Sequence, residues 1–247
     1  MSIAKVSIVT PIHNEEANIP ELVERIDKTM EAWRAKAPAR EWEHLACDDH
    51  STDGSLALLK KLAETHSRLR PLQNLKRSGQ TGGFETGFRH ATGDYIVTMD
   101  ADLQNFPEDI PQLLEPIETG RLDLTNAIRM KRQHGLAMIL ISRGGNLLIR
   151  TFLTCPVSDA ASNFTALPAK YAKDLTLAEN DHRYVIPIFV RRGLDPQRIG
   201  DVETRHTARR HGASKYKVIK KALTGVPELF RFRRRLKQGF YDFKAGA

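Results

Sequence analysis

The stretch YIVTMDADLQNFPEDIP, residues 95–111, sets two carboxylates directly after an apolar run. Residues 95–99 are typical of a buried strand, yet Asp100 and Asp102 follow with only an alanine between them. In an extended chain, side chains two residues apart point to the same side, so both carboxylates can face one point. A strand that enters a core does not normally end by collecting like charges. We therefore expect a positive group beside this pair.

The positive group that suits this pair is a divalent cation. Hard oxygen ligands favour Mg²⁺ or Mn²⁺, and Mg²⁺ usually takes one or two carboxylates together with substrate phosphates. A cation held by Asp100 and Asp102 would clamp a diphosphate, orient it and neutralise the charge that develops as it leaves. For an isolated D-x-D pair, the alternative is a solvated turn in which Asp102 caps the segment that follows. Two further polar strand ends in the chain favour the metal site.

Residues 6–128 alternate between the hydrophobic periods of strands and helices. The expected strands are residues 6–12, 44–49, 69–75, 95–100 and 122–128. The expected helices are residues 14–33, 53–66 and 107–118, with Asn14 as the N-cap of the first. Residues 81–91 predict a glycine-rich turn that leads into a short helix. This order predicts an α/β fold with a mostly parallel, doubly wound sheet and helices on both faces.

Polar clusters follow three of the expected strands. They are HNEE at 13–16, DDHSTDGS at 48–55 and DADLQ at 100–104. In open α/β sheets, ligands bind in the crevice beyond the carboxyl ends of the strands, so these clusters should share one crevice. Asp48 and Asp49 stand where a carboxylate can accept hydrogen bonds from a base edge or a ribose.

Four stretches, taken in order, carry a family resemblance. They are VSIVTPIHNEEANI at 6–19, CDDHSTDGS at 47–55, the segment 78–110 that contains MDADLQ, and HTARRHGASKY at 206–216. Together they resemble the inverting nucleotide-sugar glycosyltransferases with the GT-A fold. More narrowly, they resemble the dolichyl- or polyprenyl-phosphate glycosyltransferases, the dolichol-phosphate mannose synthase group. The resemblance runs from about Val6 to Tyr216, most of the chain.

The resemblance implies a role for each matching position. Beside the nucleotide it places Pro11, Asn14 and Glu15, and on the base or ribose Asp48 and Asp49. The metal motif would be Asp100 and Asp102, with Gln104 as a further contact, and Arg209 and Lys215 would approach the diphosphate or the acceptor phosphate. VSDAASNFTALP at 157–168 resembles the family's D-x-x-S-G-F stretch, with Asn163 where glycine is usual. That departure bears on the geometry of the acceptor site.

A phosphate acceptor fits the residues that follow the fifth expected strand. Sugar transfer to a hydroxyl needs a general base, whereas a phosphate monoester is already charged at pH 7 and needs cations that hold it in line. Arg129 and Arg143 are the candidates, because Arg129 ends a strand at the crevice and Arg143 interrupts an apolar run. The Q-x-x-R-W motif of processive polysaccharide synthases is absent, which favours a single transfer.

Positive charge gathers at the C-terminal end. The chain has 247 residues and a net charge of +8, but residues 205–247 hold 13 Lys and Arg against 2 acids, a balance of +11. The segment PELFRFRRRLKQGFYDF, residues 227–243, interleaves phenylalanines with these cations, as an amphipathic helix on an anionic membrane surface would. The alternative is a helix packed on the catalytic body with its basic residues outward. We expect a catalytic domain at 1–225 and a basic amphipathic tail at 226–247.

The expected location is the cytoplasmic face of a membrane, reached by peripheral association. Cys47 and Cys155 are the only cysteines, and neither a secretory leader nor a run of about 18 apolar residues occurs. The expected partners are a UDP- or GDP-linked sugar and a polyprenyl phosphate, with a homo-oligomer or a separate membrane subunit left open. Two other functions compete: a soluble transferase acting on a hydroxyl, and a non-catalytic nucleotide-binding partner of a membrane complex. Nucleic acid is not expected, since the basic patch is confined to one end and no nucleic-acid motif occurs.

Overall fold

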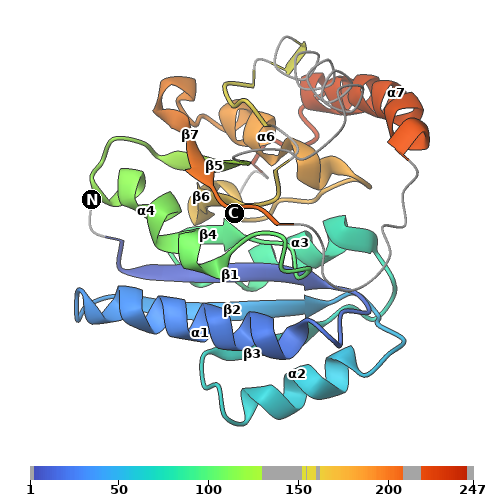
Figure 1. The fold of residues 1–247 in the computed structure, drawn as a ribbon. Coiled ribbons are helices and arrows are strands. Elements are labelled where there is room, and N and C mark those ends of the chain that lie inside the picture. The colour runs from blue at the N-terminus through green and yellow to red at the C-terminus, as the bar shows by residue number, and fades with distance from the viewer. Residues whose placement is uncertain (1–2, 130–151, 154, 160–161, 208–217, 244–247) are drawn as a thin grey trace.

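A mixed sheet of seven strands forms the centre of the molecule (Figure 1). The computed structural model describes residues 3–129, 152–153, 155–159, 162–207 and 218–243, and at Arg129 and in 218–226 only the backbone. The strands lie in the order β3-β2-β1-β4-β6-β5-β7. They are β1 (Lys5–Ile12), β2 (Glu41–Asp48), β3 (Leu69–Gln73), β4 (Tyr95–Thr98), β5 (Leu124–Arg129), β6 (Thr165–Pro168) and β7 (Ile199–Thr204). Neighbouring strands are parallel except at β6, which runs antiparallel to β4 and β5.

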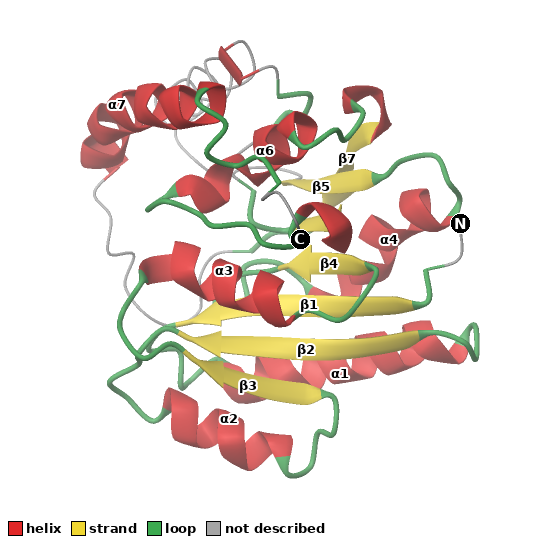
Figure 2. Ribbon diagram, turned by 180° about the vertical axis from the view of Figure 1, so that it is seen from behind, coloured by secondary structure: helices red, strands yellow, loops and turns green. Residues whose placement is uncertain are grey.

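Helices cover both faces of this sheet, as predicted. They are α1 (Ile19–Ala35), α2 (Ser55–Ala63), α3 (Gly79–His90), α4 (Ile110–Glu118), α6 (Val185–Arg191) and α7 (Val218–Lys237), with short 3₁₀ turns η1 (Pro107–Asp109), η2 (Ala169–Tyr171), η3 (Asp181–Tyr184) and η4 (Pro196–Arg198). Figures 1 and 2 show α1 and α3 on opposite faces. Successive strand residues accordingly enter different cores: Ile8 packs with the helix α1 side, and Val9 with the helix α3 side.

The glycines of residues 81–91 lie inside α3, so the predicted glycine-rich turn is wrong. A Cβ atom on Gly87 would lie 2.1 Å from Cγ1 of Val9, and one on Gly83 would lie 2.7 Å from Cβ of Pro11. Both glycines therefore face β1 and let the helix approach the strand closely. Close packing against the sheet, rather than a turn, explains the glycines.

Two further local predictions are wrong. Helix α1 begins at Ile19 with Asn18 as its N-cap, while Asn14 adopts a left-handed backbone conformation with φ of 56°. Asparagine tolerates this conformation because its short side chain can bond locally. Strand β4 ends at Thr98, so Asp100 and Asp102 lie in a loop and not in extended chain, and Leu103 that follows also has positive φ.

The sequence did not predict β6 or β7. Strand β6 has four residues, and the chain around it carries no alternating pattern. Strand β7 has the sequence IGDVET, in which glycine, aspartate and glutamate interrupt the apolar residues. Its middle residues are not fully buried, so no apolar pattern marks it as a strand. Long-range pairing with β4 and β5 makes these segments strands.

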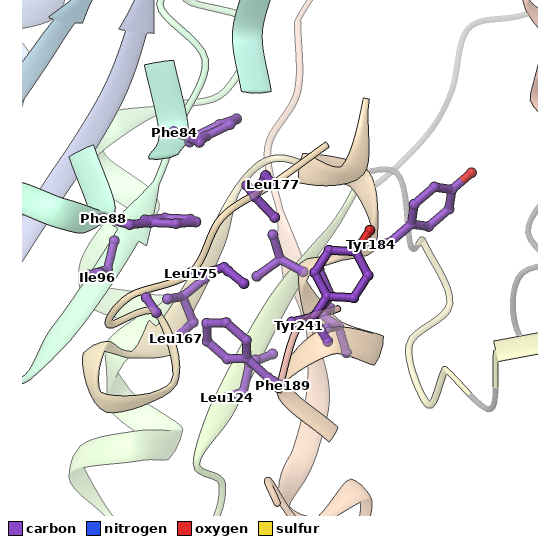
Figure 3. Packing of buried hydrophobic residues seen from close by; sticks show 14 of the residues in the cluster. Phe84, Phe88, Ile96, Leu124, Leu167, Leu175, Leu177, Tyr184, Phe189 and Tyr241 are labelled. Atoms are coloured by element: carbon purple, nitrogen blue, oxygen red, sulfur yellow. The ribbon is translucent and has the colours of Figure 1, made fainter. Parts of the chain in front are cut away.

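The C-terminal segment packs on the body of the protein. Leu229, Phe232 and Tyr241 are buried in the same apolar cluster as α3 and α6, and Figure 3 shows Tyr241 among these residues. Helix α7 starts at Val218 and runs through the boundary expected at 225/226, so the division into domain and tail stays a prediction. Among the described helices, none has both the length and the apolar composition that a bilayer crossing requires.

A buried ion pair fixes this segment to the body. Asp181 is 1% exposed, accepts a hydrogen bond of 2.6 Å from Nη2 of Arg235, and is also bonded by the Tyr241 hydroxyl. Burial raises the pKa of Asp181, and the bonds from Tyr241 and Arg235 oppose that rise. The two side chains that bond the Asp181 carboxylate, Arg235 and Tyr241, thus both come from the C-terminal segment.

We expect Arg235→Met to lower the free energy of unfolding by about 3 kcal/mol, the lower end of the range for breaking a buried pair, because the Tyr241 hydroxyl still bonds Asp181. Urea denaturation measures the change. The matched control is Arg234→Met, an exposed neighbour on the same helix. Equal stability of the two variants would contradict the assignment.

Candidate active site

The loops that follow β1 and β2 are joined into one unit. Oδ1 of Asn14 accepts a hydrogen bond of 2.8 Å from the Thr52 amide, and Nδ2 of Asn14 donates to Oγ1 of Thr52 at 3.1 Å. The amide of Glu15 donates to Oγ of Ser55 at 3.0 Å, and Asn18 donates to Oε2 of Glu15 at 2.6 Å. The side chain of Asn14 and the backbone amide of Glu15 therefore join the loop after β1 to the loop after β2, while the Glu15 side chain is bonded within its own segment.

Glu16 and Asp53 complete this junction. Oε2 of Glu16 accepts from the Gly54 amide at 2.9 Å, and Oδ2 of Asp53 accepts from the Glu16 amide at 3.3 Å. Burial acts to raise the pKa of Asp53, but hydrogen bonds from Ser55 and Glu16 outweigh it and leave the pKa lowered. The two polar motifs predicted to share a crevice are thus in direct contact.

Asp48 and Asp49 are both buried at the end of β2, but they differ in how many of their oxygens accept hydrogen bonds. Oδ1 of Asp49 accepts from Nδ2 of Asn74 at 3.0 Å and from the Ser78 amide at 2.7 Å, which ties β2 to the start of α3. Oδ2 of Asp48 accepts from the Ser51 amide at 3.2 Å, but its buried Oδ1 has no donor among the described residues. A buried acceptor without a donor costs free energy, so this oxygen suits a ligand that brings an N–H or O–H group.

The predicted metal motif follows β4 at the same edge of the sheet. Oδ1 of Asp100 accepts hydrogen bonds from Nε2 of Gln80 at 2.5 Å and from Nδ2 of Asn163 at 3.2 Å. Oδ1 of Asp102 accepts from the Gln104 amide at 3.2 Å, the local turn expected as the alternative reading of this pair. This hydrogen bond uses only Oδ1 of Asp102. The local turn and the binding of a cation by Oδ2 are therefore compatible.

The donor set of this loop fits Mg²⁺ or Mn²⁺. Asp100 and Asp102 supply hard carboxylate oxygens, and both side chains are partly exposed at the crevice. Within the described residues, no group of three or more His, Cys, Asp or Glu could enclose a metal ion. Two carboxylates with the remaining positions filled by phosphate and water are the usual arrangement for Mg²⁺.

The chain after β7 is fastened to the metal-motif loop. Nε2 of Gln104 donates to the Thr207 carbonyl at 3.3 Å, the Thr207 amide returns a bond of 3.0 Å to the Gln104 carbonyl, and Asn105 bridges His206. The predicted residues Arg209 and Lys215 follow within 208–217, outside the described residues, and Arg143 likewise lies outside them, within 130–151. Arg129 ends β5 as predicted, with its backbone alone described.

A partly apolar pocket adjoins the metal motif through Asn163. Phe84 and Phe88 of α3 line one side, and His182 and Arg183 of η3 line another. Nδ1 of His182 lies 2.8 Å from Oγ1 of Thr81, and Arg183 pairs with Glu228 of α7 at 3.4 Å. Sequence reasoning missed Gln80, His182 and Arg183, because each reaches the site through contacts between distant segments.

Residues 7–175 match the model of Glycosyl transferase family 2. The chain belongs to this family. It is 36% identical over 214 residues to the dodecaprenyl-phosphate galacturonate synthase of Rhizobium johnstonii, covering 86% of this chain and 62% of that protein. It is 32% identical over 222 residues to the undecaprenyl-phosphate 4-deoxy-4-formamido-L-arabinose transferase of Salmonella choleraesuis, covering 88% of this chain and 64% of that protein. The chain thus spans less than two thirds of the length of these family 2 relatives.

Solved structures confirm the fold. The glucosyl-3-phosphoglycerate synthase of Mycobacterium tuberculosis, in complex with Mn²⁺, UDP-glucose and phosphoglyceric acid, superposes with a TM-score of 0.68 at 21% identity, over 93% of this chain and 79% of that one. The mannosyl-3-phosphoglycerate synthase of Rubrobacter xylanophilus gives a TM-score of 0.71 at 16% identity, over 99% and 77%. The predicted resemblance to GT-A glycosyltransferases is confirmed.

We expect Asp48→Asn to weaken the binding of UDP or GDP by about 1.5–3 kcal/mol, the usual worth of a hydrogen bond to a charged group. The physical reason is the buried Oδ1 atom, which a nucleotide donor would satisfy. Calorimetric titration of both nucleotides in the presence of Mn²⁺ measures the effect. The control is Asp123→Asn, which alters a carboxylate paired with Arg198 just before β5. Unchanged affinity for both nucleotides in Asp48→Asn would remove it from the binding site.

Proposed function

We propose that this protein transfers a single sugar from a UDP- or GDP-linked donor to a polyprenyl phosphate, with inversion at the anomeric carbon. The observation that carries the proposal is the placement of three carboxylates at one edge of the sheet, where parallel strands end. Asp48 is the last residue of β2 and has a buried oxygen without a hydrogen-bond donor among the described residues, and Asp100 and Asp102 follow β4. The names of two relatives, each a polyprenyl-phosphate sugar transferase or synthase, support the acceptor.

The donor half of the reaction rests on four carboxylates. Asp48 and Asp49 would hold the base or ribose, in a crevice walled by Pro11, Asn14 and Glu15. Asp100 and Asp102 would hold Mg²⁺ or Mn²⁺, which when bound supplies positive charge to the leaving diphosphate. Gln104 keeps the loop of Asp102 in place through its bonds to Thr207.

The acceptor half needs charge and alignment. An oxygen of the acceptor phosphate forms the new bond to the anomeric carbon while the bond from that carbon to the diphosphate breaks, and the electron pair leaves with the nucleoside diphosphate. Because the acceptor oxygen is already ionised, no proton has to be removed. Arg129 and Arg143 would bind the acceptor phosphate, and Arg209 and Lys215 the diphosphate or the acceptor phosphate. A hydroxyl acceptor would require a general base in addition.

The C-terminal segment supports association with an anionic membrane, and we propose the cytoplasmic side as the location. Its inner residues are in the core, whereas Phe230 is 55% exposed and Phe240 and Phe243 are each 50% exposed. Among the α7 side chains that the structure describes, from Pro227 onward, the exposed cations are Arg231, Arg234 and Lys237. Aromatic side chains interleaved with cations match the chemistry of an anionic lipid surface.

Transfer is tested by incubating the protein with nucleotide sugars, Mn²⁺ and a short prenyl phosphate. We expect Asp102→Asn to lower the rate by about 100-fold or more, since a metal site contributes several kcal/mol to the transition state. The control Asp195→Asn removes the carboxylate charge from a matched turn, in which Oδ1 of Asp195 accepts from the Gln197 amide, two residues ahead, at 2.9 Å. A hydroxyl acceptor used in preference to the prenyl phosphate would overturn the proposed substrate, and near-normal activity of Asp102→Asn would overturn the metal site.

Membrane association is tested by sedimentation with vesicles that contain anionic phospholipid. We expect replacement of Arg231, Arg234 and Lys237 by glutamine to weaken binding by about 3 kcal/mol, at about 1 kcal/mol for each charge, and less at high salt. In the control, three other exposed cations are replaced by glutamine: Lys28 of α1, and Lys60 and Lys61 of α2. Figure 1 shows α1 and α2 on the half of the molecule opposite α7. Equal losses in the two triple variants would refute a specific role of α7.

A further inference from the structure

Two side-chain amides from distant parts of the chain meet on Asp100. Gln80 belongs to the first turn of α3 and donates to Oδ1 at 2.5 Å. Asn163 precedes β6 and donates to both oxygens, at 3.2 Å to Oδ1 and 3.3 Å to Oδ2. We infer that Gln80 and Asn163 are positioning residues that hold the Asp100 carboxylate in the orientation in which it binds a divalent cation. This inference rests on the metal site of the proposed function.

The chemistry of an amide suits this task. An ionised carboxylate only accepts hydrogen bonds, so each amide presents its NH₂ group to Asp100. An amide fixes the carboxylate without bringing a positive charge, whereas a lysine or arginine in its place would compete electrostatically with a bound cation. Hydrogen-bonded partners of this kind orient carboxylate ligands and tune their affinity for metal.

The register of the sheet explains how Asn163 reaches Asp100. In the antiparallel pair of β4 and β6, Thr98 lies opposite Thr165. Two residues beyond Thr98 is Asp100, and two residues before Thr165 is Asn163, so the same register brings these side chains together beyond the end of the ladder. Phe164, which lies between Asn163 and Thr165 in sequence and is fully buried, anchors this segment in the core. The contact is therefore built by the sheet.

Gln80 is placed by equally rigid packing. It lies three residues before Gly83, whose missing side chain lets α3 rest on Pro11 of β1. Thr81, the next residue, bonds His182 and the Asn180 amide. The start of helix α3 is thus fixed by Thr81 and Gly83, just after Gln80 in the chain, and the Gln80 amide reaches Asp100 from this helix.

Position 163 is one place where this chain departs from what the resemblance implies, since the resemblance implies glycine and the chain has asparagine. A glycine there has no side chain and offers no second amide. The asparagine of this chain therefore adds a contact to its metal motif beyond those that the resemblance implies.

The test measures metal binding directly. Mn²⁺ is titrated into the full-length chain in the presence of UDP, and free Mn²⁺ is followed by electron paramagnetic resonance. We expect Gln80→Leu and Asn163→Ala each to weaken Mn²⁺ affinity by about 10–100-fold, the range seen when hydrogen-bond partners of metal ligands are removed. We also expect excess Mn²⁺ to restore transfer activity in both variants, which it would not do for a misfolded protein.

Two controls separate positioning from general damage. Gln238→Leu makes the same chemical change at an exposed glutamine after α7. Ser162→Ala removes the bond of 3.3 Å that Oγ accepts from the Phe164 amide, one residue from Asn163, and leaves Asp100 untouched. Both controls should bind Mn²⁺ as the unaltered chain does. If Gln80→Leu does not fold, Asn163→Ala decides the question, because it lies in a loop.

The outcomes distinguish this inference from the function on which it rests. If the unaltered chain binds no Mn²⁺ even with UDP present, the metal site and the proposed function both fail. If it binds Mn²⁺ and the two variants bind equally tightly, the positioning role alone is refuted. If Ser162→Ala weakens binding as much as Asn163→Ala does, the effect belongs to the loop and the positioning role is likewise refuted.

Discussion

The antiparallel pairing of β4 with β6 is the constraint on which the rest of the site depends. It inserts one reversed strand into an otherwise parallel sheet, so that β5 and β7 continue the sheet beyond it. It also sets the residues that precede β6 opposite those that follow β4. The loop of Asp100 is therefore bordered by a second segment of the same sheet, and one of the two residues that bond its carboxylate, Asn163, is placed there by this pairing.

The sequence predicted the parallel half of the fold well and the rest poorly, for a physical reason. Strands β1 to β5 and helix α1 carry hydrophobic periods within themselves, and their carboxyl-end motifs share one edge because parallel strands impose it. Strands β6 and β7 have no such period and exist through pairing with distant partners. The glycines of α3 were misread because local propensity assigns glycine to turns, whereas here Gly83 and Gly87 serve helix–strand contact.

The same division applies to the site. The places of Asp48, Asp100 and Asp102 at the carboxyl ends of β2 and β4 could be predicted from sequence, because each stands where an apolar run ends; their roles stay predictions. The contacts of Gln80 with Asp100 and of Arg183 with Glu228 could not, since nothing in their neighbours along the chain indicates either partner. The C-terminal helix was expected as a membrane-binding element or as a packed helix. The described part shows packed inner residues, Leu229 and Phe232, beside exposed outer ones, so the proposed membrane association rests on the exposed residues alone.

The short turn η3 carries three consecutive residues with three different attachments. Asp181 bonds Arg235 and Tyr241 of the C-terminal segment, His182 contacts Thr81 of α3, and Arg183 pairs with Glu228 of α7. A segment connected in this way cannot open by itself. Release of the C-terminal segment would leave the buried Asp181 carboxylate without Arg235 and Tyr241, and would remove Glu228 from Arg183 of the pocket lining in the same event. Native-state hydrogen exchange should therefore find the amides of η3 and those of the end of α7 opening together, as one cooperative unit.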